Sequence, residues 1–251
     1  MRGAATLLQT RSLSKRFGAN VAVDNVDLVV REGTLHSIIG PNGAGKTTLF
    51  NLLSGDLQPS AGEITFKGSP ITRLDSARRS HLGIGRSFQR TNIFPQLSVF
   101  ENVRLAAQSR TAASYGMWRA ASSLHAVARR ADEVLREIDL AQHAKRRARE
   151  LAGGDQRLLE LAIALATDPA LLLLDEPSQG LSPEDAKRLM VRIRALAQRY
   201  TILLIEHNVG LVMELSTEIT VMHFGAVLAR GTPQEIRSHQ GVRDAYLGRR
   251  G

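Results

Sequence analysis

One short segment, residues 40–47, restricts the fold of this chain more than any other part of its sequence. It reads Gly-Pro-Asn-Gly-Ala-Gly-Lys-Thr and fits the pattern G-x-x-x-x-G-K-S/T, which is typical of loops that hold phosphate groups. The apolar residues 35–39 precede this segment, and the helix-forming residues 47–54 follow it. The order of strand, glycine loop and helix predicts an α/β fold with a P-loop nucleotide-binding core.

The residue types in this loop match the chemistry of a nucleotide. Gly43 and Gly45 permit backbone angles that turn successive N–H groups towards phosphate oxygens, and the following helix presents its positive end. Lys46 is predicted to reach the β- and γ-phosphates, and the Thr47 hydroxyl is predicted to ligate Mg²⁺. ATP and Mg²⁺ are therefore the expected cofactors. The predicted nucleotide-binding residues of this segment are Gly40, Pro41, Asn42, Gly43, Ala44, Gly45, Lys46, Thr47 and Thr48.

A second apolar run ends in two acidic residues. Residues 171–174 are all leucine, which predicts a buried strand, and Asp175 and Glu176 follow directly. Acids often follow strands only because they meet solvent there, so the pair is weak evidence alone. Next to a phosphate loop, two adjacent acids can have separate roles in binding the metal and activating water. Asp175 is predicted to hold Mg²⁺, and Glu176 is predicted to polarise the attacking water.

Two stretches near the N-terminus predict an antiparallel β region. Residues 7–13 and 21–30 contain β-branched residues with partial alternation of apolar and polar positions. The turn-forming residues Gly18, Ala19 and Asn20 separate them. The two stretches are therefore expected to form a hairpin.

A change in composition predicts a helical insertion. Between residues 92 and 151, Ala, Arg and Leu dominate, whereas residues 201–205 return to the pattern of a buried strand. We expect a single domain over residues 1–251. In it, a core at about 1–89 and 166–251 contains an inserted helical subdomain at about 90–165.

Composition narrows the setting in which the chain works. The net charge of +9 suits nucleic acid, an anionic lipid surface or a polyphosphate ligand, and does not choose among them. The chain has no cysteine, which excludes disulfides and thiolate metal sites. No apolar run reaches the roughly 18 to 20 residues that span a bilayer, and the first residues do not resemble a secretory signal. We therefore expect a cytoplasmic location.

Together these motifs resemble the ATPases of ATP-binding-cassette (ABC) transporters, in the expected order over nearly the whole chain. Gln89 stands at the position of that family's glutamine loop, and His207 stands at its switch histidine. Phe17 stands where an aromatic residue, usually Tyr, stacks on adenine. The resemblance implies that Gln89 contacts Mg²⁺ and the attacking water, and that His207 contacts the γ-phosphate. The implied catalytic residues are Glu176, His207 and Gln89, and the implied metal-binding residues are Thr47, Gln89 and Asp175.

Residues 151–156, Leu-Ala-Gly-Gly-Asp-Gln, are similar to the signature motif of the same family. In the family, this motif binds the γ-phosphate of a nucleotide held by the opposite subunit. The resemblance implies nucleotide-binding roles for Ala152, Gly153, Gly154 and Asp155. Ala152 replaces the usual Ser, and the lost hydroxyl costs about 1 to 3 kcal/mol of interaction with the phosphate. Asp155 replaces the more usual Gln.

The glycine pair at residues 153–154 also predicts the start of a helix. Gly153 and Gly154 are expected to open a helix, which presents unpaired N–H groups to an anion. Asp168 and Pro169 are expected to stop that helix. The apolar positions that share one of its faces are Leu158, Leu161, Ala162 and Leu165.

Four segments resemble the ATPases of importers for branched-chain amino acids, namely residues 85–95, 102–151, 156–160 and 245–248. The resemblance implies a dimer, formed by two copies of this chain or with a sister ATPase, bound to integral membrane permease subunits. It also implies a peripheral position on the inner face of the membrane and an indirect partnership with a periplasmic substrate-binding protein. Importers for urea or short amides and the ATPases of lipopolysaccharide export share much of this pattern, so the transported substrate stays open.

Two functions of other classes fit parts of the sequence. A soluble ABC ATPase acting on nucleic acid or the ribosome fits the net charge of +9. Such proteins usually carry two cassettes or a long coiled-coil arm, whereas this chain has one phosphate loop and no heptad run. A non-hydrolysing regulator fits Ala152, but the intact Lys46, Asp175, Glu176 and His207 oppose it. We therefore expect an active ATPase and no nucleic-acid partner.

Overall fold

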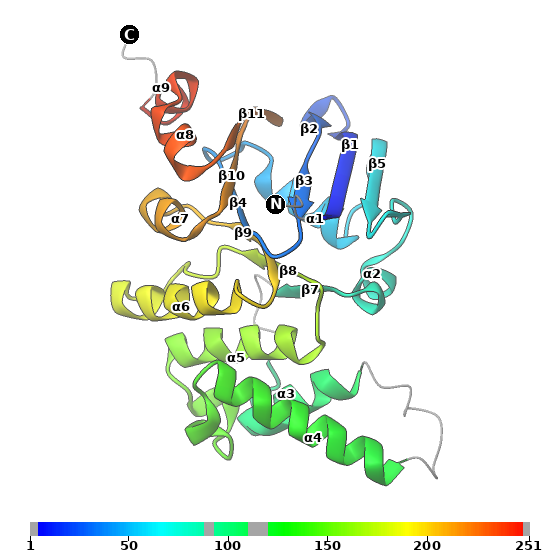
Figure 1. Ribbon diagram of the computed structural model, residues 1–251, viewed down its shortest axis with the longest axis vertical. Helices are drawn as coiled ribbons and strands as arrows, with labels where there is room; N and C mark the ends of the chain where they lie inside the picture. Colours follow the sequence, from blue (N-terminus) through cyan, green and yellow to red (C-terminus); the bar gives the residue numbers. More distant parts are fainter. Residues whose placement is uncertain (1–4, 88–92, 110–119, 248–251) are drawn as a thin grey trace.

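The computed structural model describes residues 5–87, 93–109 and 120–247. Within this part of the chain, an antiparallel sheet lies beside one half of a larger mixed sheet, and a group of helices lies at the other end of the long axis (Figure 1). Two strands of the mixed sheet, β10 (Glu218–His223) and β11 (Ala226–Gly231), lie at the same end as the antiparallel sheet, and α3, α4 and α5 form the opposite end. The expected α/β class is confirmed.

The antiparallel sheet contains the expected hairpin. Strands β1 (Thr6–Phe17) and β2 (Asn20–Val26) pair antiparallel around the turn at residues 18–19. Strand β1 also pairs with β3 (Val29–Arg31) and β5 (Ala61–Phe66), and β5 pairs with β6 (Ser69–Pro70). The prediction of an N-terminal antiparallel β region is therefore confirmed.

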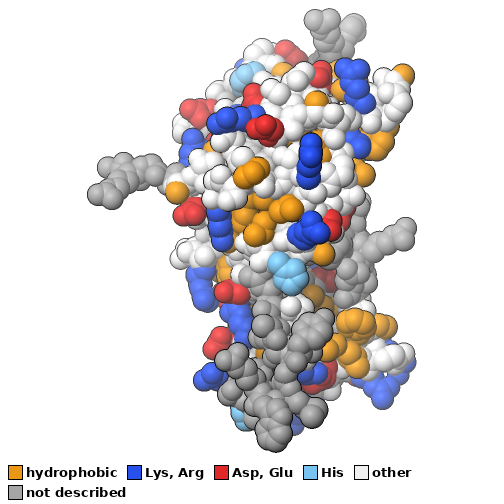
Figure 2. Space-filling view, turned by 90° about the vertical axis from the view of Figure 1, so that its right-hand side faces the viewer, with side chains coloured by type: hydrophobic (Ala, Val, Ile, Leu, Met, Phe, Trp, Pro, Cys, Tyr) orange, Lys and Arg blue, Asp and Glu red, His pale blue; other side chains and the backbone are white. Residues whose placement is uncertain are grey.

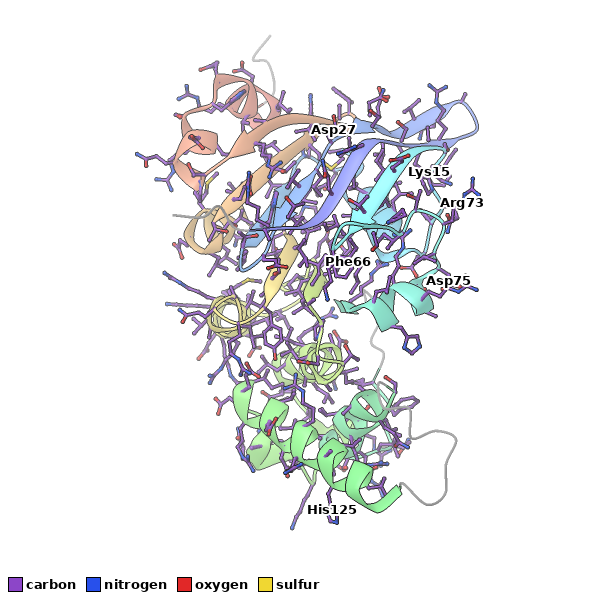
Figure 3. The ribbon with its side chains drawn as sticks, turned by 45° about the vertical axis from the view of Figure 1, so that its right-hand side comes forward. Lys15, Asp27, Phe66, Arg73, Asp75 and His125 are labelled. Carbon is purple, nitrogen blue, oxygen red and sulfur yellow. The ribbon has the colours of Figure 1, made fainter. Side chains whose placement is uncertain are left out.

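The second predicted stretch, residues 21–30, is divided into two strands, β2 and β3, and side-chain hydrogen bonds explain the break. The buried Oγ1 of Thr10 donates to the carbonyl of Val26 at 2.8 Å and accepts from the N–H of Leu28 at 2.9 Å. The carboxylate of Asp27 (Figure 3) accepts from the N–H of Ser12 at 2.6 Å. These side chains take the place of ladder bonds where the chain passes from β2 to β3.

The mixed sheet has the strand order β11-β10-β4-β9-β8-β7 within the described residues. Its strands are β4 (Leu35–Ile39), β7 (Ile84–Ser87), β8 (Leu171–Asp175), β9 (Thr201–Ile205), β10 (Glu218–His223) and β11 (Ala226–Gly231). All but β11 run parallel, and β11 pairs antiparallel with β10. Every residue of β4, β8 and β9 is buried, which confirms the three predicted buried strands.

Strand β8 separates two apolar cores because successive side chains point to opposite faces of a sheet. Leu171 and Leu173 belong to the core shared with α1 (Lys46–Ser54) and the antiparallel sheet. Leu172 and Leu174 belong to the core shared with the helices. A run of four leucines therefore fits a strand that is covered on both faces.

The helical end of the molecule contains α3 (Val99–Gln108), α4 (Ala120–Glu137) and α5 (Gly153–Ala166), with two short 3-10 turns, η2 (Ala141–His143) and η3 (Ala148–Glu150). The predicted apolar face of α5 is buried in one core with residues of α3 and α4. The described residues thus confirm the helical character expected between residues 92 and 151.

The remaining helices are α2 (Ser76–Leu82), α6 (Pro183–Leu196), α7 (Val209–Leu215), α8 (Pro233–Ser238) and α9 (Gln240–Leu247). In the described part of the chain, no helix is both long and apolar enough to cross a bilayer. On the face shown in Figure 2, lysine and arginine side chains are scattered among other types and do not form one continuous patch.

Candidate functional site

The glycine loop links the end of β4 to the start of α1, as predicted, and close packing explains two of its glycines. A Cβ atom on Gly40 would collide with the carbonyl oxygen of Met222 on β10. Gly45 has a φ of 93°, and a Cβ atom there would collide with the carbonyl oxygen of Ala22 on β2. Other residues therefore do not fit at these positions without displacing the backbone.

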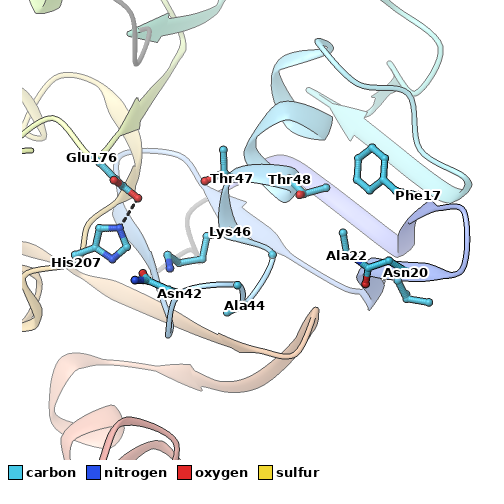
Figure 4. Close-up of a pocket in the computed structure, with 13 residues that line it drawn as sticks. Phe17, Asn20, Ala22, Asn42, Ala44, Lys46, Thr47, Thr48, Glu176 and His207 are labelled. Atoms are coloured by element: carbon cyan, nitrogen blue, oxygen red, sulfur yellow. Dashed lines mark ion pairs between the residues drawn. The ribbon is translucent and has the colours of Figure 1, made fainter.

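A cleft of about 570 Å³ opens above this loop (Figure 4), within the size range of small-ligand sites. Its lining residues are Phe17, Asn20, Val21, Ala22, Asn42, Gly43, Ala44, Gly45, Lys46, Thr47, Thr48, Glu176 and His207. The structure thus brings most of the predicted nucleotide-binding residues together. Sequence reasoning missed Asn20, Val21 and Ala22, although the turn directly after Phe17 was a usable signal for them.

Lys46 is held at the base of the cleft. Its side chain is buried, and Nζ donates to the carbonyls of Gly40 at 2.8 Å and Pro41 at 3.0 Å. Burial lowers the pKa of Lys46, while the nearby Glu176 and Asp175 carboxylates raise it. The loop therefore fixes the ammonium group where it can interact with phosphate oxygens entering the cleft.

Glu176 and His207 meet at the side of the cleft next to Lys46 (Figure 4). Nε2 of His207 lies 2.5 Å from Oε1 of Glu176, whose side chain is buried. The backbone of Glu176 has a φ of 49°, and its N–H donates to the carbonyl of Ile205 at 2.9 Å. A non-glycine residue in the left-handed region stores strain, which is common where a side chain must be aimed precisely at a site.

Asp175 lies at the end of β8 but does not line the cleft. Its side chain is buried, and neither carboxylate oxygen has a hydrogen-bond partner among the described residues. Burial raises the pKa of Asp175 to about 6, and Glu176 raises it as well, while Arg86, His207 and Lys46 lower it. A buried carboxylate without a hydrogen-bond partner near a phosphate loop fits an oxygen ligand of a hydrated Mg²⁺ ion.

Arg86, at the end of β7, is a feature that sequence reasoning missed. Its Nη2 atom lies 3.7 Å from Oδ2 of Asp175 and donates to Oδ1 of Asn51 at 2.8 Å. Its Nη1 atom donates to Ser54 at 2.8 Å and pairs with Asp56. Arg86 therefore joins the acidic end of β8 to the C-terminal part of α1, and no local sequence pattern predicts such a contact.

The structure does not bring the signature residues to the cleft of their own chain. Ala152 occupies the N-cap position of α5 and is exposed, and no side-chain hydrogen bond caps that helix. A Cβ atom on Gly154 would collide with Asp185 of α6, whereas one on Gly153 would meet open space. Asp155 accepts from Nη1 of Arg188 at 2.8 Å. Gln89, the remaining predicted site residue, lies outside the described residues.

A strand, a glycine loop with a buried lysine, a helix and a Glu-His pair at the ends of neighbouring strands define a P-loop nucleotide-binding domain. The family described as "ABC transporter" matches residues 23–179. The family described as "Branched-chain amino acid ATP-binding cassette transporter" matches residues 226–251. The chain therefore belongs to the ABC transporter family, as one of its ATPase subunits.

Relatives of known name match over almost their whole length. The high-affinity branched-chain amino acid transport ATP-binding protein LivG of Salmonella typhimurium is 42% identical over 249 residues, covering 96% of this chain and 98% of LivG. The protein BraF of Pseudomonas aeruginosa, with the same description, is 39% identical over 250 residues, covering 96% of this chain and 98% of BraF.

Solved structures agree with this assignment. A nucleotide-free ATP-binding cassette from an ABC transporter has a TM-score of 0.84 at 30% identity, covering 97% of this chain and 100% of its own. The ADP conformation of an ATP-binding cassette of an ABC transporter also has a TM-score of 0.84 at 30% identity, covering 98% of this chain and 100% of its own. The fold is thus the fold of a cassette that binds adenine nucleotides.

Proposed function

We propose that this chain is the ATP-hydrolysing subunit of an importer for branched-chain amino acids. The observation that carries the proposal is the match of residues 226–251 to a family specific for these transporters. The similarity to LivG and BraF over nearly the full length of each protein supports it. In this role the chain lies on the inner face of the membrane, bound to permease subunits that carry the substrate specificity.

The described cleft supports a division of labour in nucleotide binding. Phe17 lines the cleft with 47% of its surface exposed, so its ring is available to stack on adenine. Lys46 and the loop N–H groups hold the phosphate oxygens, and Thr47 and Asp175 hold Mg²⁺ together with Gln89. When bound, Mg²⁺ neutralises charge on the β- and γ-phosphates. The domain division, with a helical subdomain at about 90–165, is part of the same proposal.

Hydrolysis uses Glu176 and His207. The Glu176 carboxylate orients and polarises the water that attacks the γ-phosphate. His207 lies within hydrogen-bond distance of this carboxylate, so the same imidazole can orient Glu176 and reach the γ-phosphate. The two side chains act as a unit, because a change in the position of one alters the contact made by the other.

The second subunit completes the site. Gly154 packs against Asp185 and Asp155 accepts from Arg188, both on α6, and this arrangement leaves Gly153 uncovered. We propose that residues 152–155 of one subunit bind the γ-phosphate held by the loop of the other. ATP then lies within the dimer interface, and its binding favours the closed dimer by mass action.

The transport proposal is tested by uptake in the source organism. Deletion of this chain should abolish high-affinity uptake of labelled leucine, isoleucine and valine, and the wild-type chain should restore it. Glu176→Gln keeps the size of the side chain but removes the catalytic carboxylate, so this variant should be present at the membrane and fail to restore uptake. Normal leucine uptake in the deletion strain, with uptake of urea or a short amide lost instead, would contradict the proposed substrate class.

A further inference from the structure

Glu206, the residue before His207, is a buried acid whose described contacts are all with the main chain. Its side chain is 3% exposed. Oε1 accepts from the N–H of Ser178 at 3.0 Å, and Oε2 accepts from the N–H of His207 at 3.1 Å. Both carboxylate oxygens are thus occupied by backbone donors that belong to different segments.

Two other contacts connect these segments, namely the backbone bond from Glu176 to Ile205 and the contact between the His207 and Glu176 side chains. Strands β8 and β9 pair in register until Asp175 lies opposite Ile205, and the N–H of Glu176 then donates to the carbonyl of Ile205. Beyond this point the two segments that follow β8 and β9 leave the sheet. The Glu206 carboxylate continues the link by one further step, since it joins the turn that contains Ser178 to the start of the His207 segment.

Burial of a carboxylate costs free energy unless strong hydrogen bonds compensate for the lost water. A carboxylate that accepts from backbone N–H groups forms charge-assisted bonds, which are stronger than neutral ones. Both bonds of Glu206 therefore fix the separation of two backbone segments. The catalytic Glu176 lies at the start of one segment, and His207 lies in the other.

We propose that Glu206 is a positioning residue for ATP hydrolysis, which holds His207 at the correct place relative to Glu176 and to the turn at residues 177–181. The inference rests on the proposed function, because it assigns Glu206 a role in the hydrolytic step. Glu206 is not among the residues that line the cleft, and its described contacts are with backbone N–H groups. It acts through His207, and it links the position of that imidazole to the turn that contains Ser178.

The test uses the purified full-length chain with Glu206→Gln, which preserves shape but offers one acceptor oxygen instead of two. Glu218→Gln is the matched control, because Glu218 is also a hydrogen-bonded carboxylate with little exposed surface but lies at the opposite end of the parallel strands. We expect Glu206→Gln to lower kcat about 10- to 100-fold, as misplacement of a catalytic group by about 1 Å does, with KM for ATP changed less than about twofold. The control should keep the wild-type kcat.

A double-mutant cycle separates positioning from general stability. If Glu206 acts through His207, then Glu206→Gln should lower kcat little further in a chain that already carries His207→Ala. Fully additive effects would overturn the proposal. Glu206→Asp keeps the charge and is expected to lower kcat less than Glu206→Gln. If Glu206→Gln does not fold, Glu206→Asp becomes the test variant. A wild-type kcat for Glu206→Asp would then overturn the proposal.

Amide hydrogen exchange provides a readout that does not depend on activity. In the wild-type chain the N–H groups of Ser178 and His207 should exchange slowly, and Glu206→Gln should accelerate them while leaving the amides of β9 unchanged. Fast exchange of these two amides in the wild type would overturn the proposed role of Glu206. If the wild-type chain has no ATPase activity but these two amides exchange slowly, the proposed function is contradicted, while the two hydrogen bonds of Glu206 are supported.

Discussion

We expect the stability of this protein to fall below neutral pH because His36 is buried in a place that disfavours its charged form. The side chain lies on β4 with no exposed surface, and Nε2 lies 2.8 Å from Oγ1 of Thr220. The pKa of His36 is lowered from 6.5 to about 4, mainly by burial; Glu218 raises it, and Arg230 and Arg31 contribute to lowering it. The charged form is therefore more acceptable to the unfolded chain than to the folded one.

The sign and the size of the effect follow from the two pKa values. Because the folded-state pKa lies below the unfolded-state value, the unfolded chain takes up a proton first as the pH falls. The contribution to stability is complete above pH 6.5 and is lost as the pH falls towards about 4. The whole shift corresponds to about 3 kcal/mol, of which about 2 kcal/mol is lost by about pH 5.

The assay compares wild type with His36→Gln in urea unfolding at about pH 7.5 and about pH 5. Gln can retain the hydrogen bond to Thr220 but does not titrate, and all other groups titrate in both proteins. The wild-type chain should lose about 2 kcal/mol more than the variant between the two pH values, at an unchanged m-value. Parallel losses in the two proteins would refute the argument that His36 is buried in its neutral form.

Three further predictions follow from single contacts. Lys46→Ala should reduce ATP turnover at least about a hundredfold, because it removes the cation beside the β- and γ-phosphates, and near-normal hydrolysis by a folded variant would contradict the loop assignment. Ala152→Ser should keep or raise ATPase activity and raise the free energy of unfolding by about 0.5 to 2 kcal/mol, because Ala152 is the uncapped N-cap of α5; a loss in both assays would show that no hydroxyl fits there. Arg79→Met should lower the free energy of unfolding by about 3 to 5 kcal/mol, because the fully buried guanidinium donates to the carbonyls of Leu52, Leu53, Thr72 and Leu74; a loss under about 1 kcal/mol would mean that those carbonyls find other partners.

Local patterns were sufficient for the parts of the fold that depend on neighbouring residues. The three fully buried strands, the loop and the hairpin each have a short signature, and the apolar face of α5 follows from helical spacing alone. Strand β5 was not predicted because the pattern of Ala61–Phe66 mixes exposed and buried positions and gives no continuous apolar run. The division of residues 21–30 was also missed, because it depends on the Thr10 hydroxyl from another strand.

The same limit applies to the candidate site. The residues that line the cleft from the loop, together with Glu176 and His207, stand in recognisable motifs. Arg86 and Glu206 do not, because each gains its meaning from a partner far along the chain: the N–H of Ser178 is 28 residues from Glu206, and Asp56 is 30 residues from Arg86. A sequence pattern identifies groups that do chemistry more readily than groups that hold them in place.

Strand order explains why these holding groups matter. Strands β4, β9 and β8 are neighbours in that order, and all three are parallel, so the segments that follow them leave the sheet at the same edge. The segment after β4 carries Lys46, the segment after β8 carries Glu176, and the segment after β9 carries His207. His207 therefore follows the middle strand, between the loop that binds phosphate and the acid that acts on water. A residue that fixes the position of this middle segment affects the distances from the His207 imidazole to Lys46 and to Glu176 at once. The Glu206 side chain can do this because it accepts hydrogen bonds from the N–H groups of Ser178 and His207.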